Sequence, residues 1–118
     1  MLKRKTLNEI YNIVDEFYPS KQMLKKYKNE PDVPLGFLMC VTVRAKIYDN
    51  IQELISRYKK GQDYSDILNV IFKRLRLHQY QVKRLSRTNP SADHESVKRY
   101  CIGLATLLYV AFTQKTSN

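Results

Sequence analysis

The stretch Ser65–Arg87, SDILNVIFKRLRLHQYQVKRLSR, decides the fold of this chain. Mainly apolar residues recur alternately four and three positions apart from Tyr64 onward, which places them on one face of an α-helix: Tyr64, Leu68, Ile71, Leu75, His78, Val82 and Leu85. The opposite face, an arc of about 100° with no acidic residue, carries Lys73, Arg76, Tyr80, Lys83, Arg84 and Arg87. We therefore predict a helix with one buried side and one basic side. The basic side either meets a negatively charged partner or is simply a solvated outer face.

The composition of the whole chain points to a basic soluble domain. Its 118 residues fit a single domain over 1–118, with 43% hydrophobic and 27% charged residues. Twenty-one Lys and Arg against eleven Asp and Glu give a net charge of +10. Self-repulsion of this size favours a polyanionic partner, so RNA and/or DNA is the leading class of ligand.

Helical periodicity and turn signals predict an all-α fold with helices over about 6–18, 35–60, 64–87 and 90–113. Thr6–Glu9 is typical of a capping box at the start of the first helix. Two prolines within 29–34 interrupt the chain before the second helix, and Gly61 ends that helix. Asn89 and Pro90 are suited to cap and begin the fourth. The expected architecture is an up-down four-helix bundle. A further helical turn is possible within 20–28.

The last predicted helix is apolar nearly all round between 101 and 112. A helix of a four-helix bundle buries one stripe, so a helix with more apolar surface than one stripe needs a second partner. We expect this surplus to form a subunit interface in a ring-like or barrel-like homo-oligomer, through Ile102, Gly103, Leu107, Tyr109 and Val110.

No arrangement of residues typical of an active site emerges from the sequence. His78 lies on the apolar stripe and fits a core histidine, and His94 has too few neighbouring ligands for zinc. Asp49 and Glu53 fit a surface salt-bridge ladder with Lys46 and Arg57. We expect no enzyme activity, no catalytic residues, no metal, no cofactor and no small-molecule substrate.

The expected location is the cytoplasm, without membrane insertion. Cys40 and Cys101 lie in apolar helical runs and are expected to be reduced core thiols. No signal peptide is expected, and the longest apolar run is about half of what a bilayer requires.

The predicted nucleic-acid-binding residues belong to the third helix and are Lys73, Arg74, Arg76, Tyr80, Lys83, Arg84 and Arg87. Lysines and arginines supply salt-dependent affinity for phosphates, and aromatic rings stack on unpaired bases. Further basic clusters occur at 3–5, 21–28, 59–60 and 98–99, and several are interleaved with tyrosines: Tyr27, Tyr58, Tyr80 and Tyr100.

Two short patterns resemble a known superfamily of four-helix proteins. Ile47-x-x-Asn50-Ile51-x-Glu53, with Arg44 upstream, resembles the I-x-x-N-I-x-E signature of proteins encoded in intervening sequences of bacterial large-subunit ribosomal RNA. Ile102-Gly103, followed by Tyr109, resembles the I-G-x-x-x-G-G-W run of the Avd family, the accessory variability determinants of diversity-generating retroelements. The chain departs from these patterns at Leu54, which replaces Gly, at Leu107-Leu108, which replace a small pair, and at Tyr109, which replaces Trp.

The Avd resemblance implies a non-enzymatic accessory protein that forms a homo-pentameric barrel. Such a barrel would bind a reverse transcriptase and nucleic acid during mutagenic copying of a template repeat. A helical Gly103 would then allow a close approach between helices. Two alternatives remain: a four-helix scaffold of the ribosomal intervening-sequence type without a reverse transcriptase partner, and a small protein-binding bundle of the bacteriocin-immunity kind.

Overall fold

The computed structural model describes residues 2–17, 25, 35–88 and 94–113. Four helices account for most of this part of the chain: α1 (Arg4–Phe17), α3 (Leu35–Lys59), α4 (Ser65–Thr88) and α5 (His94–Phe112). No strand occurs among the described residues. The predicted all-α fold with four helices is therefore confirmed.

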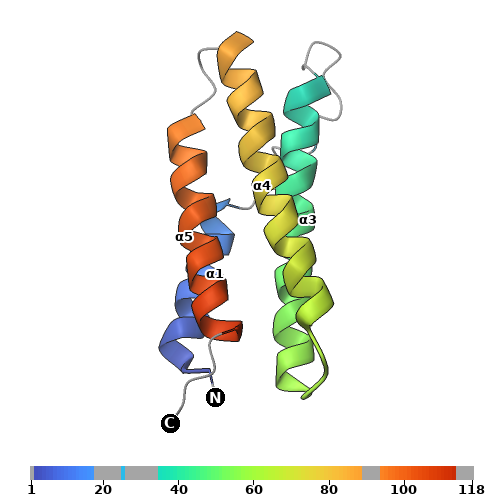
Figure 1. Ribbon diagram of the computed structural model, residues 1–118, viewed down its shortest axis with the longest axis vertical. Helices are drawn as coiled ribbons and strands as arrows, with labels where there is room; N and C mark the ends of the chain where they lie inside the picture. Colours follow the sequence, from blue (N-terminus) through green and yellow to red (C-terminus); the bar gives the residue numbers. More distant parts are fainter. Residues whose placement is uncertain (1, 18–24, 26–34, 89–93, 114–118) are drawn as a thin grey trace.

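The helices run alternately up and down along the long axis of the molecule (Figure 1). Helix α4 packs against both α3 and α5, and α1 packs mainly against α5 and less against α3. The shorter α1 lies beside the lower part of the bundle in Figure 1. Helix α4 thus makes the main contact of α3 with the rest of the bundle.

Where both can be compared, helix boundaries lie within about one residue of the prediction, except at the start of α1. The Leu7 N–H donates to the Lys3 carbonyl over 3.1 Å, so helical hydrogen bonding begins before Thr6. Thr6 consequently lies inside the first turn of α1, and the predicted capping box at Thr6–Glu9 is wrong. The predicted cap at Asn89–Pro90 lies outside the described residues. So does the possible turn over 20–28, apart from Lys25, which is helical and exposed.

The connection between α3 and α4 is fixed by backbone hydrogen bonds. Gly61 adopts the left-handed region with φ of 70°, where a side chain would be strained. Its N–H donates to the Tyr58 carbonyl at 3.1 Å, and the Gln62 N–H donates to the Arg57 carbonyl at 2.9 Å, as in a Schellman motif. The predicted stop at Gly61 is confirmed. Asp63 then caps α4 by accepting hydrogen bonds from the Ser65 N–H and hydroxyl, which lower the pKa of its carboxyl.

The core of the bundle forms around the apolar stripe of α4. The stripe is buried at 68, 71, 75, 78 and 82, and its ends at Tyr64 and Leu85 are half-buried. In the core it joins buried side chains of α3 and α5, the largest fully buried of which are Ile47, Ile51, Leu54, Leu104 and Leu108. Burial of this stripe leaves the opposite side of α4 outside the core.

Three aromatic rings close the lower end of the bundle. The ring centroid of Phe112 lies 5.5 Å from that of Tyr58 and 5.4 Å from that of Tyr64. The Tyr58 hydroxyl accepts a hydrogen bond from the Leu2 N–H at 2.6 Å, and the Tyr64 hydroxyl donates to the Phe112 carbonyl at 3.3 Å. Tyr58 therefore packs within the bundle. This corrects the sequence-based interpretation that grouped it with tyrosines able to stack on bases.

Replacing Phe112 by alanine should lower the free energy of unfolding by about 3–5 kcal/mol. Phe112 is 7% exposed and contacts both tyrosines, so truncation removes apolar burial and leaves a cavity. Chemical denaturation followed by circular dichroism measures the change. Lys98→Ala, at an exposed position of the same helix, is the control and should change the value by less than about 0.5 kcal/mol. Equal effects of the two variants would contradict this account of the aromatic cluster.

Candidate nucleic-acid interface

The side of α4 that faces away from the core is basic and exposed. The predicted binding residues that lie on it, all exposed, are Lys73, Arg76, Tyr80, Lys83, Arg84 and Arg87. We call these six residues the basic face of α4. The Arg84 guanidinium carbon lies 5.8 Å from the centre of the Tyr80 ring, at cation–π distance. One surface of a single helix therefore presents five cations and one aromatic ring.

Arg74 is placed differently from the other predicted binding residues. It is half-buried, and its guanidinium donates a hydrogen bond to the side-chain oxygen of Asn50 on α3. This bond ties the two helices together at the asparagine of the Ile47–Glu53 pattern. Arg74 thus contributes to helix packing, and periodicity along α4 alone could not indicate that Asn50 would be its partner.

Charge divides the α3–α4 hairpin into two halves. The half near the connecting loop, residues 49–72, contains four carboxylates and three cations. The remaining half, residues 39–48 and 73–88, contains eight cations and no carboxylate. On the loop side Arg57 pairs with Glu53 at 2.9 Å and with Asp66 at 2.7 Å. Attraction for a polyanion is therefore concentrated on the half that carries the basic face of α4.

None of the five cations of the basic face forms an ion pair within the described part of the chain. Like charges along one helix repel each other, and the repulsion is relieved by salt or by a bound anion.

The ion pairs of Arg57 correct the salt-bridge ladder predicted on α3. Glu53 pairs with Arg57 as expected, whereas Lys46 and Asp49 form no ion pair with a described residue.

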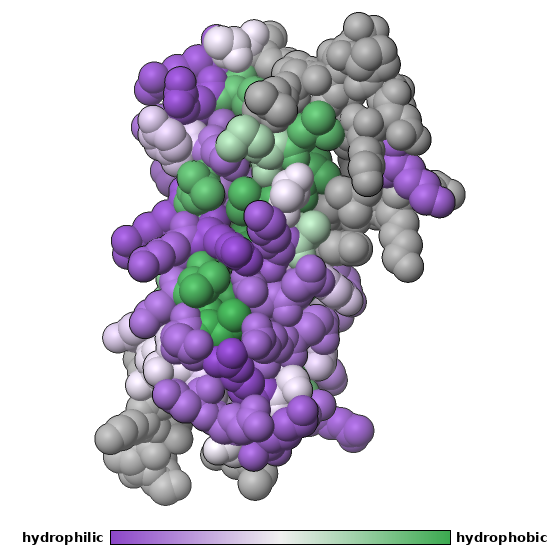
Figure 2. Space-filling model, turned by 90° about the vertical axis from the view of Figure 1, so that its right-hand side faces the viewer, coloured by the Kyte–Doolittle hydropathy of each residue, from purple (hydrophilic) through white to green (hydrophobic). Residues whose placement is uncertain are grey.

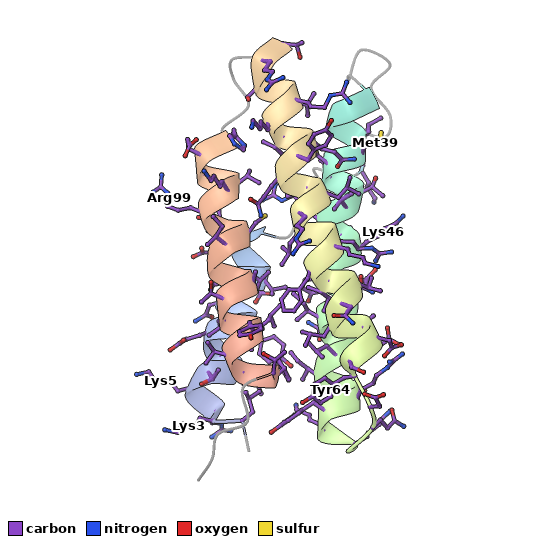
Figure 3. The ribbon with its side chains drawn as sticks, viewed as in Figure 1. Lys3, Lys5, Met39, Lys46, Tyr64 and Arg99 are labelled. Carbon is purple, nitrogen blue, oxygen red and sulfur yellow. The ribbon has the colours of Figure 1, made fainter. Side chains whose placement is uncertain are left out.

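The described basic clusters at 3–5 and 98–99 lie on a different side of the molecule from the basic face of α4. Figure 3 shows Lys3, Lys5 and Arg99 projecting from the α1–α5 side of the molecule, whereas Lys46 projects from α3 on the opposite side. Lys3 and Lys5 lie at the lower end of the bundle, far from the C-terminal end of α4 (Figures 1 and 3). The cluster at 21–28 lies outside the described residues except for Lys25.

Helix α5 exposes apolar side chains along its outer side. Ile102, Tyr109 and Val110 are about half exposed, with Tyr109 at 54%. Leu107 is partly buried against the core, so it is less available to a partner than its position in the sequence suggests. A Cβ atom at Gly103 would meet nothing within 4 Å. The expected close approach of another helix to Gly103 therefore does not occur within the described part of this chain.

Burial shifts the pKa values of His78 and of both cysteines toward their uncharged forms. His78 is 1% exposed, and burial, with a smaller effect of the Arg44 charge, lowers its pKa to about 3. Burial likewise raises the pKa of Cys101 to about 12 and raises that of Cys40. Both cysteines are buried, and no disulfide joins them. Groups shifted in these directions stay uncharged at neutral pH.

No group of three or more His, Cys, Asp or Glu side chains among the described residues is arranged to hold a metal ion. No helix in this part of the chain has the length and apolar character needed to cross a bilayer.

Comparison of the chain with protein-family models, with curated proteins and with solved structures finds no match.

The buried His78 should make stability depend on pH. Its pKa is about 3 in the folded protein and about 6.5 when unfolded, so the unfolded chain binds more protons between these values. Stability is therefore lost as the pH falls below 6.5, by about 2 kcal/mol at pH 5. Denaturation of the wild type and His78→Leu at pH 7 and pH 5 should show a smaller loss in the variant. An equal loss in both proteins would contradict the assignment to His78.

Proposed function

We propose that this protein is a non-enzymatic nucleic-acid-binding protein that contacts the phosphate backbone through the basic face of α4. The observation that carries the proposal is the charge division of the α3–α4 hairpin, whose cation-rich half contains no carboxylate. A surface of this kind attracts RNA or DNA without regard to sequence and with strong dependence on salt. The lack of ion pairs to described residues leaves the guanidinium and ammonium groups available to phosphates.

We further propose that binding serves a diversity-generating retroelement, with its reverse transcriptase as the protein partner. This part of the proposal rests on the resemblance of the 102–109 segment to the Avd family and of the 47–53 segment to the intervening-sequence proteins of the same superfamily. In this chain the asparagine of the 47–53 pattern accepts a hydrogen bond from Arg74 and so helps to hold the basic helix in place. The net charge of +10 also suits a protein that accompanies nucleic acid during copying.

The exposed apolar side of α5 supports a second proposal, that the protein forms a homo-oligomer. Three half-exposed apolar side chains on one helix are costly to leave in water, and a second copy of the chain would bury them. A pentamer is the number that the resemblance implies. In such an assembly several basic faces would act together on one nucleic-acid strand, which raises the overall affinity.

Reversing four charges on the basic face should abolish binding at low salt. The variant carries Lys73→Glu, Arg76→Glu, Lys83→Glu and Arg87→Glu, and each change replaces a phosphate-attracting group by a repelling one. Fluorescence anisotropy with single-stranded RNA and DNA over a range of salt concentrations measures the effect. In the wild type the logarithm of the affinity should fall linearly with the logarithm of the salt concentration.

The matched control reverses four exposed lysines away from this surface, namely Lys3, Lys5, Lys59 and Lys60. The control changes the net charge by the same amount. It therefore shows whether binding depends on the position of the reversed charges or only on the net charge of the protein. Retention of most of the affinity by the control is expected. Equal loss in both variants would contradict the placement of the interface on α4.

Introducing a charge into the α5 surface should dissociate the oligomer. Tyr109→Glu places a carboxylate among the exposed apolar side chains, where burial against a second copy would be unfavourable. Light-scattering mass at high salt should fall from that of an oligomer to that of a monomer. Lys98→Glu, exposed on the same helix, is the control and should keep the wild-type mass. A wild-type protein that is monomeric at every concentration would contradict the proposal.

Genomic position distinguishes the proposed partner from the alternatives. A retroelement accessory protein is encoded beside a reverse transcriptase, whereas a scaffold of the intervening-sequence type is encoded inside a ribosomal RNA locus. A protein-binding bundle of the immunity kind would not bind nucleic acid, and its behaviour would be insensitive to salt.

A further inference from the structure

We propose that the groove between α3 and the C-terminal half of α4 receives an unpaired nucleobase, so that the protein prefers single strands to duplexes. The proposal rests on the function proposed above and specifies the form of nucleic acid that the basic face of α4 binds. The groove supports the proposal because it has an apolar wall, an exposed aromatic ring and an arginine-bearing rim.

The groove has a volume of about 650 Å³, which is within the range of about 300–1,000 Å³ typical of small-molecule clefts. Among the described residues its apolar wall is formed by Met39 of α3 together with Leu77 and Leu85 of α4. Met39, which lies near the upper end of α3 in Figure 3, is 49% exposed, and Leu77 is similarly exposed. Figure 2 shows hydrophobic patches over the middle and upper parts of this side, whereas its lower part is hydrophilic.

Tyr80 supplies a flat surface on which a base can stack. It lines the groove and is 58% exposed, more than any other large hydrophobic residue of the described chain. The Arg84 guanidinium lies 5.8 Å from the centre of its ring and lines the same groove. A planar guanidinium beside an aromatic ring orders the ring and offers a second surface for stacking.

The rim of the groove is complementary to the phosphates that flank such a base. Arg84 and Arg87 line it, and both helices that form it lack carboxylates throughout this half of the hairpin. An arginine fork binds phosphate oxygens in pairs, so a nucleotide could place its base on the apolar wall and its phosphate on the rim.

A duplex cannot use the groove in this way. Its bases are stacked on one another and present only their edges, so the apolar wall and the Tyr80 ring would stay uncovered. Phosphates of a duplex could still meet the basic face of α4. The wall and the ring therefore favour single strands, whose bases can unstack from their neighbours. A purely electrostatic surface would not have this preference.

The test compares two strands of equal length and charge, one of thymidines and one of abasic sites. The wild type should bind the thymidine strand about 5- to 150-fold more tightly than the abasic strand at the same salt concentration, as base–aromatic stacking provides. Tyr80→Leu should remove this difference by weakening only the binding of the thymidine strand. Tyr80→Phe, the matched control, keeps the ring and should behave as the wild type.

Each result has a distinct meaning. Equal affinity of the wild type for the two strands would overturn the base-binding groove while leaving phosphate binding by α4 in place. This measurement uses the wild-type protein alone. Equal weakening of both strands by Tyr80→Leu would also overturn it. Absence of binding to either strand at low salt would overturn the proposed function itself.

Discussion

The burial of one stripe of α4 between α3 and α5 is the constraint on which the rest of the structure depends. The stripe from Leu68 to Val82 lies in the core, and α3 has its main contact with the bundle through it. Because side chains of a helix keep fixed directions around its axis, burying this stripe forces the opposite residues outward. Folding and the presentation of cations are therefore the same event, and a variant that loosens the core would also displace the charged surface.

Charge is distributed unequally between the two ends of the α3–α4 hairpin. The loop end is closed by the Schellman turn at Gly61, the Asp63 cap and the paired Arg57, which hold the hairpin together. The other end has cations without carboxylates. Repulsion between these cations lowers the stability of the fold. The free energy gained by burying the apolar core offsets this repulsion and keeps the cations close together. A bound polyanion would relieve this repulsion.

Helical periodicity predicted the two faces of α4, because a pattern that repeats with the helical turn fixes which residues share a side. It could not predict contacts that depend on how helices lie against each other. Arg74 is directed to Asn50, Tyr58 joins the Phe112 cluster, and Met39 completes a groove with α4, each through a neighbouring helix. The predicted start of α1 was wrong for a local reason. A hydrogen bond from the Leu7 N–H to the Lys3 carbonyl extends the helix toward the N-terminus, so that it begins before Thr6.

The measurement that most directly tests the central claim is ultraviolet cross-linking of the protein to single-stranded nucleic acid, with the cross-linked peptides identified by mass spectrometry. Cross-links should be concentrated within residues 73–88 of α4, with Tyr80 prominent because aromatic rings in contact with bases react readily. Cross-links confined to α1 or to the outer side of α5, with none in α4, would contradict it.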